Sequence, residues 1–123
     1  MEQFATFVST LLQSRTQAQV FHWQAQGVGS DAAHRALGTY YDEIIDLVDG
    51  LVESTQGRYG IIRGYQTQGA LREDTNYVTY FEALCKFVET TRTQIPQDSY
   101  IQNQIDEIVH LVETTKYKLK FLH

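Results

Sequence analysis

The chain has 123 residues, with 10 Lys and Arg against 15 Asp and Glu and a formal net charge of −5. This length fits one domain, residues 1–123, that can bury a core without cross-links. The acidic balance disfavours nucleic acid as the main partner, and the single cysteine, Cys85, excludes an internal disulfide and a cysteine-rich zinc site. We expect a soluble protein of the reducing cytoplasm, because no apolar run approaches the about 20 residues of a membrane span and no leader-type N-terminus is visible.

Helical periodicity begins at the N-terminus. Apolar residues recur at spacings of three and four from Glu2 to about Gln26, which predicts a first helix. The segment 27–30 ends this helix, and Ser30 or Asp31 can cap a second helix that runs to about Gln56. Carboxylates are interleaved with the apolar stripe of the second helix: Asp42, Glu43, Asp46, Asp49 and Glu53.

A long connection follows the second helix. The stretch Gly57–Gly69 holds four glycines and is typical of a crossover along a bundle rather than of a helix. Asp74 or Thr75 can then cap a third helix, which ends near Gln94.

The last segment is again periodic. Asp98 or Ser99 can cap a fourth helix, and nothing of useful length is typical of a strand. The sequence therefore predicts an all-α, ferritin-like four-helix bundle with a long connection between the second and third helices.

Four residues on the first two helices have the chemistry of metal ligands. His22 lies on or beside the buried side of the first helix, whereas Asp49 and Glu53, four residues apart, share one face of the second. Two carboxylates so placed can hold a hard or borderline cation. His34 lies on the same side of that helix, but the fifteen residues to Asp49 span about 22 Å. One chain therefore cannot bring His34 and Asp49 to the same ion.

Two copies of the chain remove this difficulty. If their second helices pack antiparallel about a two-fold axis near residue 42, His34 of one copy comes opposite Asp49 of the other. A metal ion would then contact His22, Asp49 and Glu53 of one subunit and His34 of its partner. This mixture of nitrogen and carboxylate ligands suits iron, zinc or manganese.

The same residues carry a family resemblance. The segment HWQAQG at residues 22–27, followed by His34, Asp49 and Glu53, resembles the ferroxidase pattern of the Dps family, the ferritin-like DNA-protecting mini-ferritins. The resemblance covers about residues 1–57, in which four ligand-type residues match in type and spacing.

The resemblance implies an iron-binding mini-ferritin that protects against oxidative stress. Fe(II) would be oxidised at an intersubunit site, preferably by hydrogen peroxide, and stored as a ferric mineral inside a shell of twelve subunits. His22, Asp49 and Glu53 would be the ligands of one subunit, and His34 the ligand donated across the dimer. Trp23 would lie near the iron, where it can donate an electron.

The chain departs from the family pattern at Gly38, where the family usually has an aspartate. One interpretation is a lost ligand, and another is close packing of Gly38 against a neighbouring helix. A lysine-rich tail is also absent, so DNA binding by a tail is not expected. The alternative function is a non-catalytic helical assembly protein that keeps the dimer and a degenerate metal site.

Glu107 and His110 form a second pattern, the ExxH spacing that diiron bundle proteins use. Glu82 or Glu89 of the third helix could complete such a central site. The second helix has no matching ExxH, so we expect Glu107 to face solvent and His110 to lie on the surface.

Other conspicuous side chains have simpler interpretations. Trp23, Tyr40 and Tyr41 are expected to pack in the core or at an interface, because aromatic rings supply large apolar area. Cys85 falls in the apolar stripe of the third helix and is expected to be an inert small hydrophobic residue.

Overall fold

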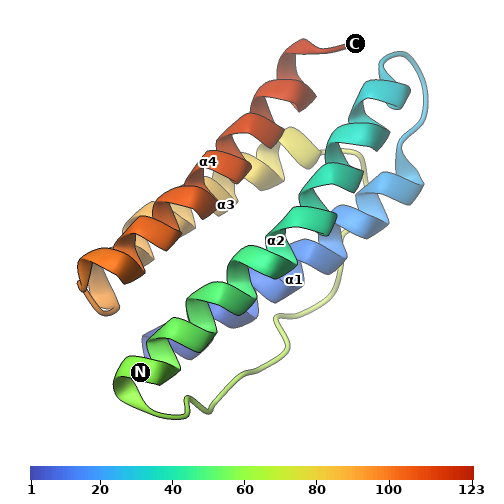
Figure 1. Ribbon diagram of the computed structural model, residues 1–123. Helices are drawn as coiled ribbons and strands as arrows, with labels where there is room; N and C mark the ends of the chain where they lie inside the picture. The colour runs from blue at the N-terminus through green and yellow to red at the C-terminus, as the bar shows by residue number, and fades with distance from the viewer.

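Four helices form the molecule, and none of the chain is in a strand (Figure 1). The computed structural model describes all residues, 1–123. The predicted all-α bundle is confirmed, and a short 3₁₀ turn (Arg92–Gln94) extends the third helix. The helices are α1 (Glu2–Gln24), α2 (Ser30–Tyr59), α3 (Tyr77–Thr91) and α4 (Ser99–Phe121).

The helices are arranged as two pairs. α1 and α2 form an antiparallel hairpin, and residues 60–76 then run back along the bundle, so that α3 points the same way as α2 and α4 returns antiparallel to it (Figure 1). α2 packs between α1 and α4, whereas α3 packs on α4 and α1. None of the four helices offers an apolar stretch long enough to cross a bilayer.

One apolar core joins all four helices. Large aromatic side chains dominate its interior, and the Tyr40 ring meets the Phe81 ring edge-on at a centroid distance of 4.9 Å. The Tyr40 hydroxyl group is also buried, and it shares a 2.7 Å hydrogen bond with the Ser14 hydroxyl group. Burial raises the pKa of Tyr40 above its usual range, so this hydroxyl group stays protonated. The interpretation of Tyr40 as a core residue is confirmed.

The extended residues 60–76, here called the strap, lie along α1 and are held by its polar side chains. The Ser9 hydroxyl group accepts a hydrogen bond from the backbone N–H of Gln66 at 3.0 Å. Gln17, which is 2% exposed, accepts from the backbone N–H of Arg72 at 2.7 Å and donates to its carbonyl at 2.9 Å. The buried Gln17 side chain therefore satisfies the backbone N–H and C=O groups of Arg72, which have no partner from a helix or a neighbouring strand.

Replacing Gln17 by Ala is expected to destabilise the protein by about 1–3 kcal/mol, because it leaves the N–H and C=O of Arg72 without protein partners. Urea unfolding measures the loss, and hydrogen exchange at the Arg72 amide should accelerate. Gln13→Ala is the matched control, since Gln13 makes one long 3.4 Å bond to the strap at an exposed position. Equal losses in the two variants would contradict the role of Gln17.

The ends of α2 differ from the prediction. The helix continues through Gly57 to Tyr59, so the connection starts later than the glycine content suggested. Gly29, in the left-handed conformation at φ 81°, precedes the helix, and neither Ser30 nor Asp31 makes a capping hydrogen bond. Asp31 pairs instead with the exposed side chain of the residue one turn later. A glycine turn therefore starts α2, and Ser30 is already helical.

The predicted caps of α3 and α4 also act differently. Asn76 precedes α3, and the Asp74 carboxylate accepts from the Asn76 backbone N–H at 2.9 Å, which closes a turn ahead of the helix. Neither Asp74 nor Thr75 caps α3. Asp98 does precede α4, but its carboxylate accepts from the Tyr59 hydroxyl group at 2.6 Å and joins the ends of α2 and α4.

Candidate functional site

His22 and His34 lie against each other in a single chain. His22 is in the last turn of α1 and His34 is in the first turns of α2, and the short connection at residues 25–29 brings the two positions to the same level of the hairpin. Their rings stack with centroids 3.5 Å apart and planes 18° apart. His22 is half-buried and His34 is exposed.

Reciprocal hydrogen bonds fix both rings. The His22 Nδ1 lies 2.6 Å from the His34 carbonyl oxygen, and the His34 Nδ1 lies 2.9 Å from the His22 carbonyl oxygen. A carbonyl can only accept, so both Nδ1 atoms carry the proton. The Nε2 atom of each neutral ring then has the free lone pair, as in metal-binding histidines whose other nitrogen donates to a backbone carbonyl.

The histidine pair also has a structural role. The His22 carbonyl belongs to the last turn of α1, where carbonyl groups have no partner within the helix. The Nδ1–H of His34 satisfies this carbonyl and so caps α1. The pair therefore joins α1 to α2 even when no ion is bound.

Gly38 has a clear reason to be a glycine. A Cβ atom at this position would lie 3.3 Å from Cε1 and 3.5 Å from Nδ1 of His22. The predicted close packing of Gly38 against another helix is therefore confirmed. The His22 ring occupies the space into which a side chain at position 38 would project.

An alanine in place of a glycine in a helix interior ordinarily raises the free energy of unfolding by about 1 kcal/mol. Gly38→Ala is expected to show no such gain, because the fixed His22 ring cannot yield to the new methyl group. Gly57→Ala is the control, since Gly57 is also in α2 and nothing lies within 4 Å of its added Cβ atom. Thermal unfolding should show a stabilised control and an unchanged or destabilised Gly38 variant. Equal stabilisation of both variants would show that the His22 ring is free to move.

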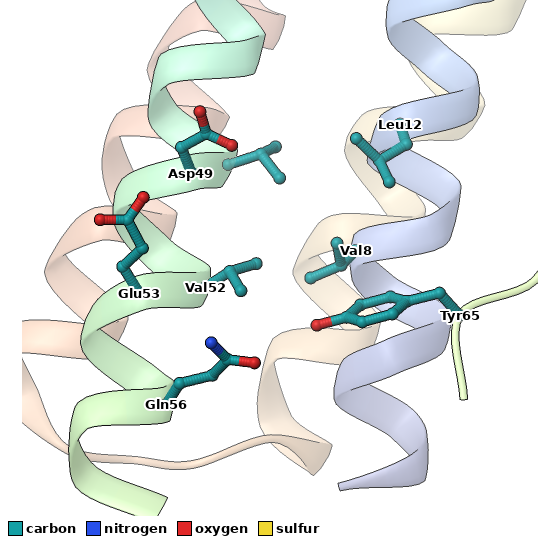
Figure 2. Close-up of a pocket in the computed structure, with 8 residues that line it drawn as sticks. Val8, Leu12, Asp49, Val52, Glu53, Gln56 and Tyr65 are labelled. Carbon is teal, nitrogen blue, oxygen red and sulfur yellow. The ribbon is translucent and has the colours of Figure 1, made fainter. Parts of the chain in front are cut away.

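Asp49 and Glu53 lie farther along α2, beside an apolar groove (Figure 2). Both carboxylates are exposed, and neither makes a hydrogen bond or an ion pair with another side chain. Like charges one helical turn apart repel each other, so a bound cation would relieve the repulsion.

The groove has a volume of about 310 Å³ and lies between α1, α2 and the strap. In Figure 2, Val52 of α2 points towards Val8 of α1, and the Tyr65 ring of the strap lies beside Val8. Leu12 lines the same groove and is 40% exposed. The groove could not be predicted from the sequence, because Tyr65 reaches it from the strap, which carries no periodic pattern.

The predicted division of ligands between two subunits needs a correction. His22 stacks on His34, and His34 is fifteen residues, about 22 Å, from Asp49 along α2. His22 therefore cannot share an ion with Asp49 and Glu53 of its own chain, and no three His, Cys, Asp or Glu side chains of one chain are placed to hold a metal ion. A complete site would take both histidines from one copy and both carboxylates from the other.

The neighbouring aromatic residues differ in position. Trp23 is 66% exposed, so it is not a core residue and remains available for an interface. Tyr41 is half-buried and meets the His22 ring edge-on at 5.4 Å, with the Arg15 guanidinium group 5.6 Å from the centre of the Tyr41 ring. The contact of Tyr41 with His22 was not foreseen, although its position two turns after His34 could have suggested it.

Glu107 and His110 are both exposed, as expected. They line a surface groove between α4 and α2, and the acidic residues across it are Glu43 and Asp46 rather than side chains of α3. Cys85 is half-buried with its thiol group 3.5 Å from a Glu113 carboxylate oxygen, and burial raises the pKa of this thiol group.

The molecule is an all-helical bundle with two groups of candidate ligands on its α1–α2 face. The stacked pair His22 and His34, here called the histidine clasp, lies at one end of this face, and the exposed carboxylates of Asp49 and Glu53 lie toward the other end. The chain belongs to a family of unknown function (DUF5856), whose model matches residues 22–119 and so includes all four candidate ligands. No curated protein and no solved structure matches the chain. The resemblance to the Dps family stays a prediction.

Proposed function

We propose that two copies of this protein bind a divalent transition-metal ion between them and oxidise Fe(II) there. Each site would use the Nε2 atoms of His22 and His34 from one subunit and the carboxylates of Asp49 and Glu53 from the other. An antiparallel two-fold axis that places His34 opposite Asp49 creates this site twice. In the cell, the protein would store or detoxify iron in the cytoplasm, within a larger shell of subunits as the resemblance to the Dps family implies.

The observation that carries the proposal is the reciprocal histidine clasp. Both Nδ1–H groups donate to backbone carbonyls, which leaves both Nε2 lone pairs free for a metal ion. The unpaired carboxylates of Asp49 and Glu53 supply the negative charge that such an ion needs. Two imidazole nitrogens and two carboxylates suit Fe(II), with zinc and manganese as substitutes.

The clasp sets a condition for binding. A metal ion lies in the plane of each imidazole ring that binds it, but the two planes are only 18° apart and the rings are stacked. One ring therefore has to turn before both Nε2 atoms can reach one ion. The energy of the metal–ligand bonds has to exceed the loss of the carbonyl hydrogen bond of the ring that turns, about 1 kcal/mol.

Iron is the substrate of the proposed reaction. Carboxylate oxygens favour Fe(III) over Fe(II), because Fe(III) is the harder and more highly charged ion, and this preference lowers the reduction potential. Two Fe(II) ions each lose one electron to hydrogen peroxide. The O–O bond breaks, two protons are taken up and two water molecules form. Where a site holds one ion at a time, the first Fe(II) splits the peroxide into a hydroxide ion and a hydroxyl radical, and a second Fe(II) supplies the electron that converts the radical to water.

An anaerobic Fe(II) titration followed by a pulse of hydrogen peroxide tests the proposal. Saturable binding of at least one Fe(II) per site, followed by fast formation of Fe(III), is the expected result. Competition by Zn²⁺ should slow the oxidation, because Zn²⁺ suits the same ligands and has no redox chemistry. Absence of saturable binding would overturn the proposal.

A second candidate function is a non-catalytic assembly protein, and the near-parallel stacking of the two rings favours it. In this case the histidine clasp only caps α1 and holds it to α2. The packing of His22 then explains why Gly38 stands where the Dps pattern has an aspartate. Such a protein would form the same dimer without binding Fe(II). The titration separates the two functions.

A further inference from the structure

We infer that Trp23 of one copy inserts into the apolar groove of a second copy, the groove that Val8, Leu12, Val48, Val52 and Tyr65 line beside Asp49 and Glu53. The inference rests on the two-fold dimer of the proposed function but not on the binding of iron. It specifies which side chain closes the interface beside each candidate metal site.

Trp23 and the groove lie on the same face of the molecule. Leu12, which lines the groove, and Trp23 are eleven residues apart in α1, which is about three turns of helix, so their side chains point in nearly the same direction. Trp23 is 66% exposed and Leu12 is 40% exposed, so both leave apolar surface uncovered within their own chain. Because Trp23 and Leu12 are about 16 Å apart along the helix, Trp23 cannot fill the groove of its own chain.

The positions along the bundle agree with this insertion. His22 stacks on His34 and Arg15 lies over Tyr41, which places Trp23 at the level of residue 33 of α2. An antiparallel two-fold axis that brings His34 opposite Asp49 also brings this level opposite residue 50 of the partner subunit. Residue 50 lies between Val48 and Val52, the two valines of α2 that line the groove.

Chemistry and size also favour a second copy as the occupant. The groove is about 310 Å³ and mostly apolar, with carboxylates on one rim. A second exposed apolar side chain, Val28, lies five residues after Trp23 in the turn before α2. A buried Trp side chain contributes about 150–250 Å² of interface. Two symmetric insertions, each covering a similar area of groove, supply a substantial part of the about 1,200–2,000 Å² of a stable interface.

Trp23 is the single tryptophan, so its fluorescence reports its own burial. In metal-free protein with a chelator, raising the protein concentration should shift the emission to shorter wavelength and reduce acrylamide quenching several-fold. Both changes should follow the monomer-to-dimer transition in sedimentation velocity. Leu12→Asp should abolish the changes and the dimer, because it places a charge in the groove. Tyr117→Asp, at a 55% exposed position of α4, should leave them intact.

A cross-linking experiment tests the contact itself. In a Cys85→Ser background, a Trp23→Cys chain mixed with a Val52→Cys chain should form a disulfide-linked heterodimer, because Val52 lies in the groove close to residue 50 and a disulfide needs Cα atoms within about 7 Å. The heterodimer should exceed either homodimer on a non-reducing gel. A dimer whose Trp23 stays exposed, or a protein that stays monomeric at every concentration, would overturn the inference. Trp23 burial without Fe(II) binding would overturn only the proposed function.

Discussion

Replacing Glu53 by Ala is expected to abolish saturable Fe(II) binding and the fast oxidation that follows a peroxide pulse. Loss of residues that merely orient metal ligands costs about 10–100-fold in affinity, so removal of a charged ligand should cost at least as much. The fold should be unaffected or slightly stabilised, because Glu53 is exposed, has no partner in its own chain and lies one turn from Asp49. Anaerobic titration and circular dichroism of the same samples measure both effects.

Glu43→Ala is the matched control for this variant. Glu43 is also an exposed glutamate of α2, but it lines the groove that faces α4. Its replacement removes the same charge from the same helix and should leave Fe(II) binding unchanged. Equal binding by the two variants would show that Fe(II) associates with the acidic surface in general and not with the proposed site.

The largest effect on stability is expected for Phe81→Ala, at about 3–5 kcal/mol. Phe81 is fully buried, and its ring packs edge-on against Tyr40 of α2 at 4.9 Å and against Tyr80 of α3 at 5.4 Å. Its removal opens a cavity where α3 meets α2, and the rigid Tyr40 side chain cannot close it. Denaturant unfolding measures the loss as a lower midpoint.

Phe121→Ala is the control for the core variant. Phe121 ends α4 and is 63% exposed, so its replacement should change the free energy of unfolding by less than about 0.5 kcal/mol. A loss at Phe81 no larger than that at Phe121 would show that the two helix pairs are not joined through one core.

The helices could be predicted from the sequence because their apolar stripes are long and regular. The residues of the α4 stripe at Ile101, Ile105, Ile108 and Val112 are all buried, as a period of about 3.6 requires. The helix ends were harder to predict, because capping depends on contacts between elements. Asp98, for example, bonds Tyr59 of another helix rather than an amide of α4.

The candidate ligands could be named from the sequence, but their grouping was wrong. Spacing along one helix separated His34 from Asp49 correctly, whereas nothing in a single helix shows which residues of two helices meet. The short turn at residues 25–29 held the missing signal, because residues equally distant from the middle of a helical hairpin come together. His22 and His34 are each six residues from Val28.

The most direct test of the intersubunit site mixes two inactive variants, His22→Ala and Glu53→Ala. In a heterodimer, the Glu53→Ala chain supplies an intact histidine pair and the His22→Ala chain supplies both carboxylates, so one of the two sites is complete. Unfolding and refolding an equal mixture should therefore restore about a quarter of the wild-type Fe(II) binding and peroxide-driven oxidation. A mixture as inactive as the separate variants, in samples that sedimentation shows to be dimeric, would contradict a site shared in this way.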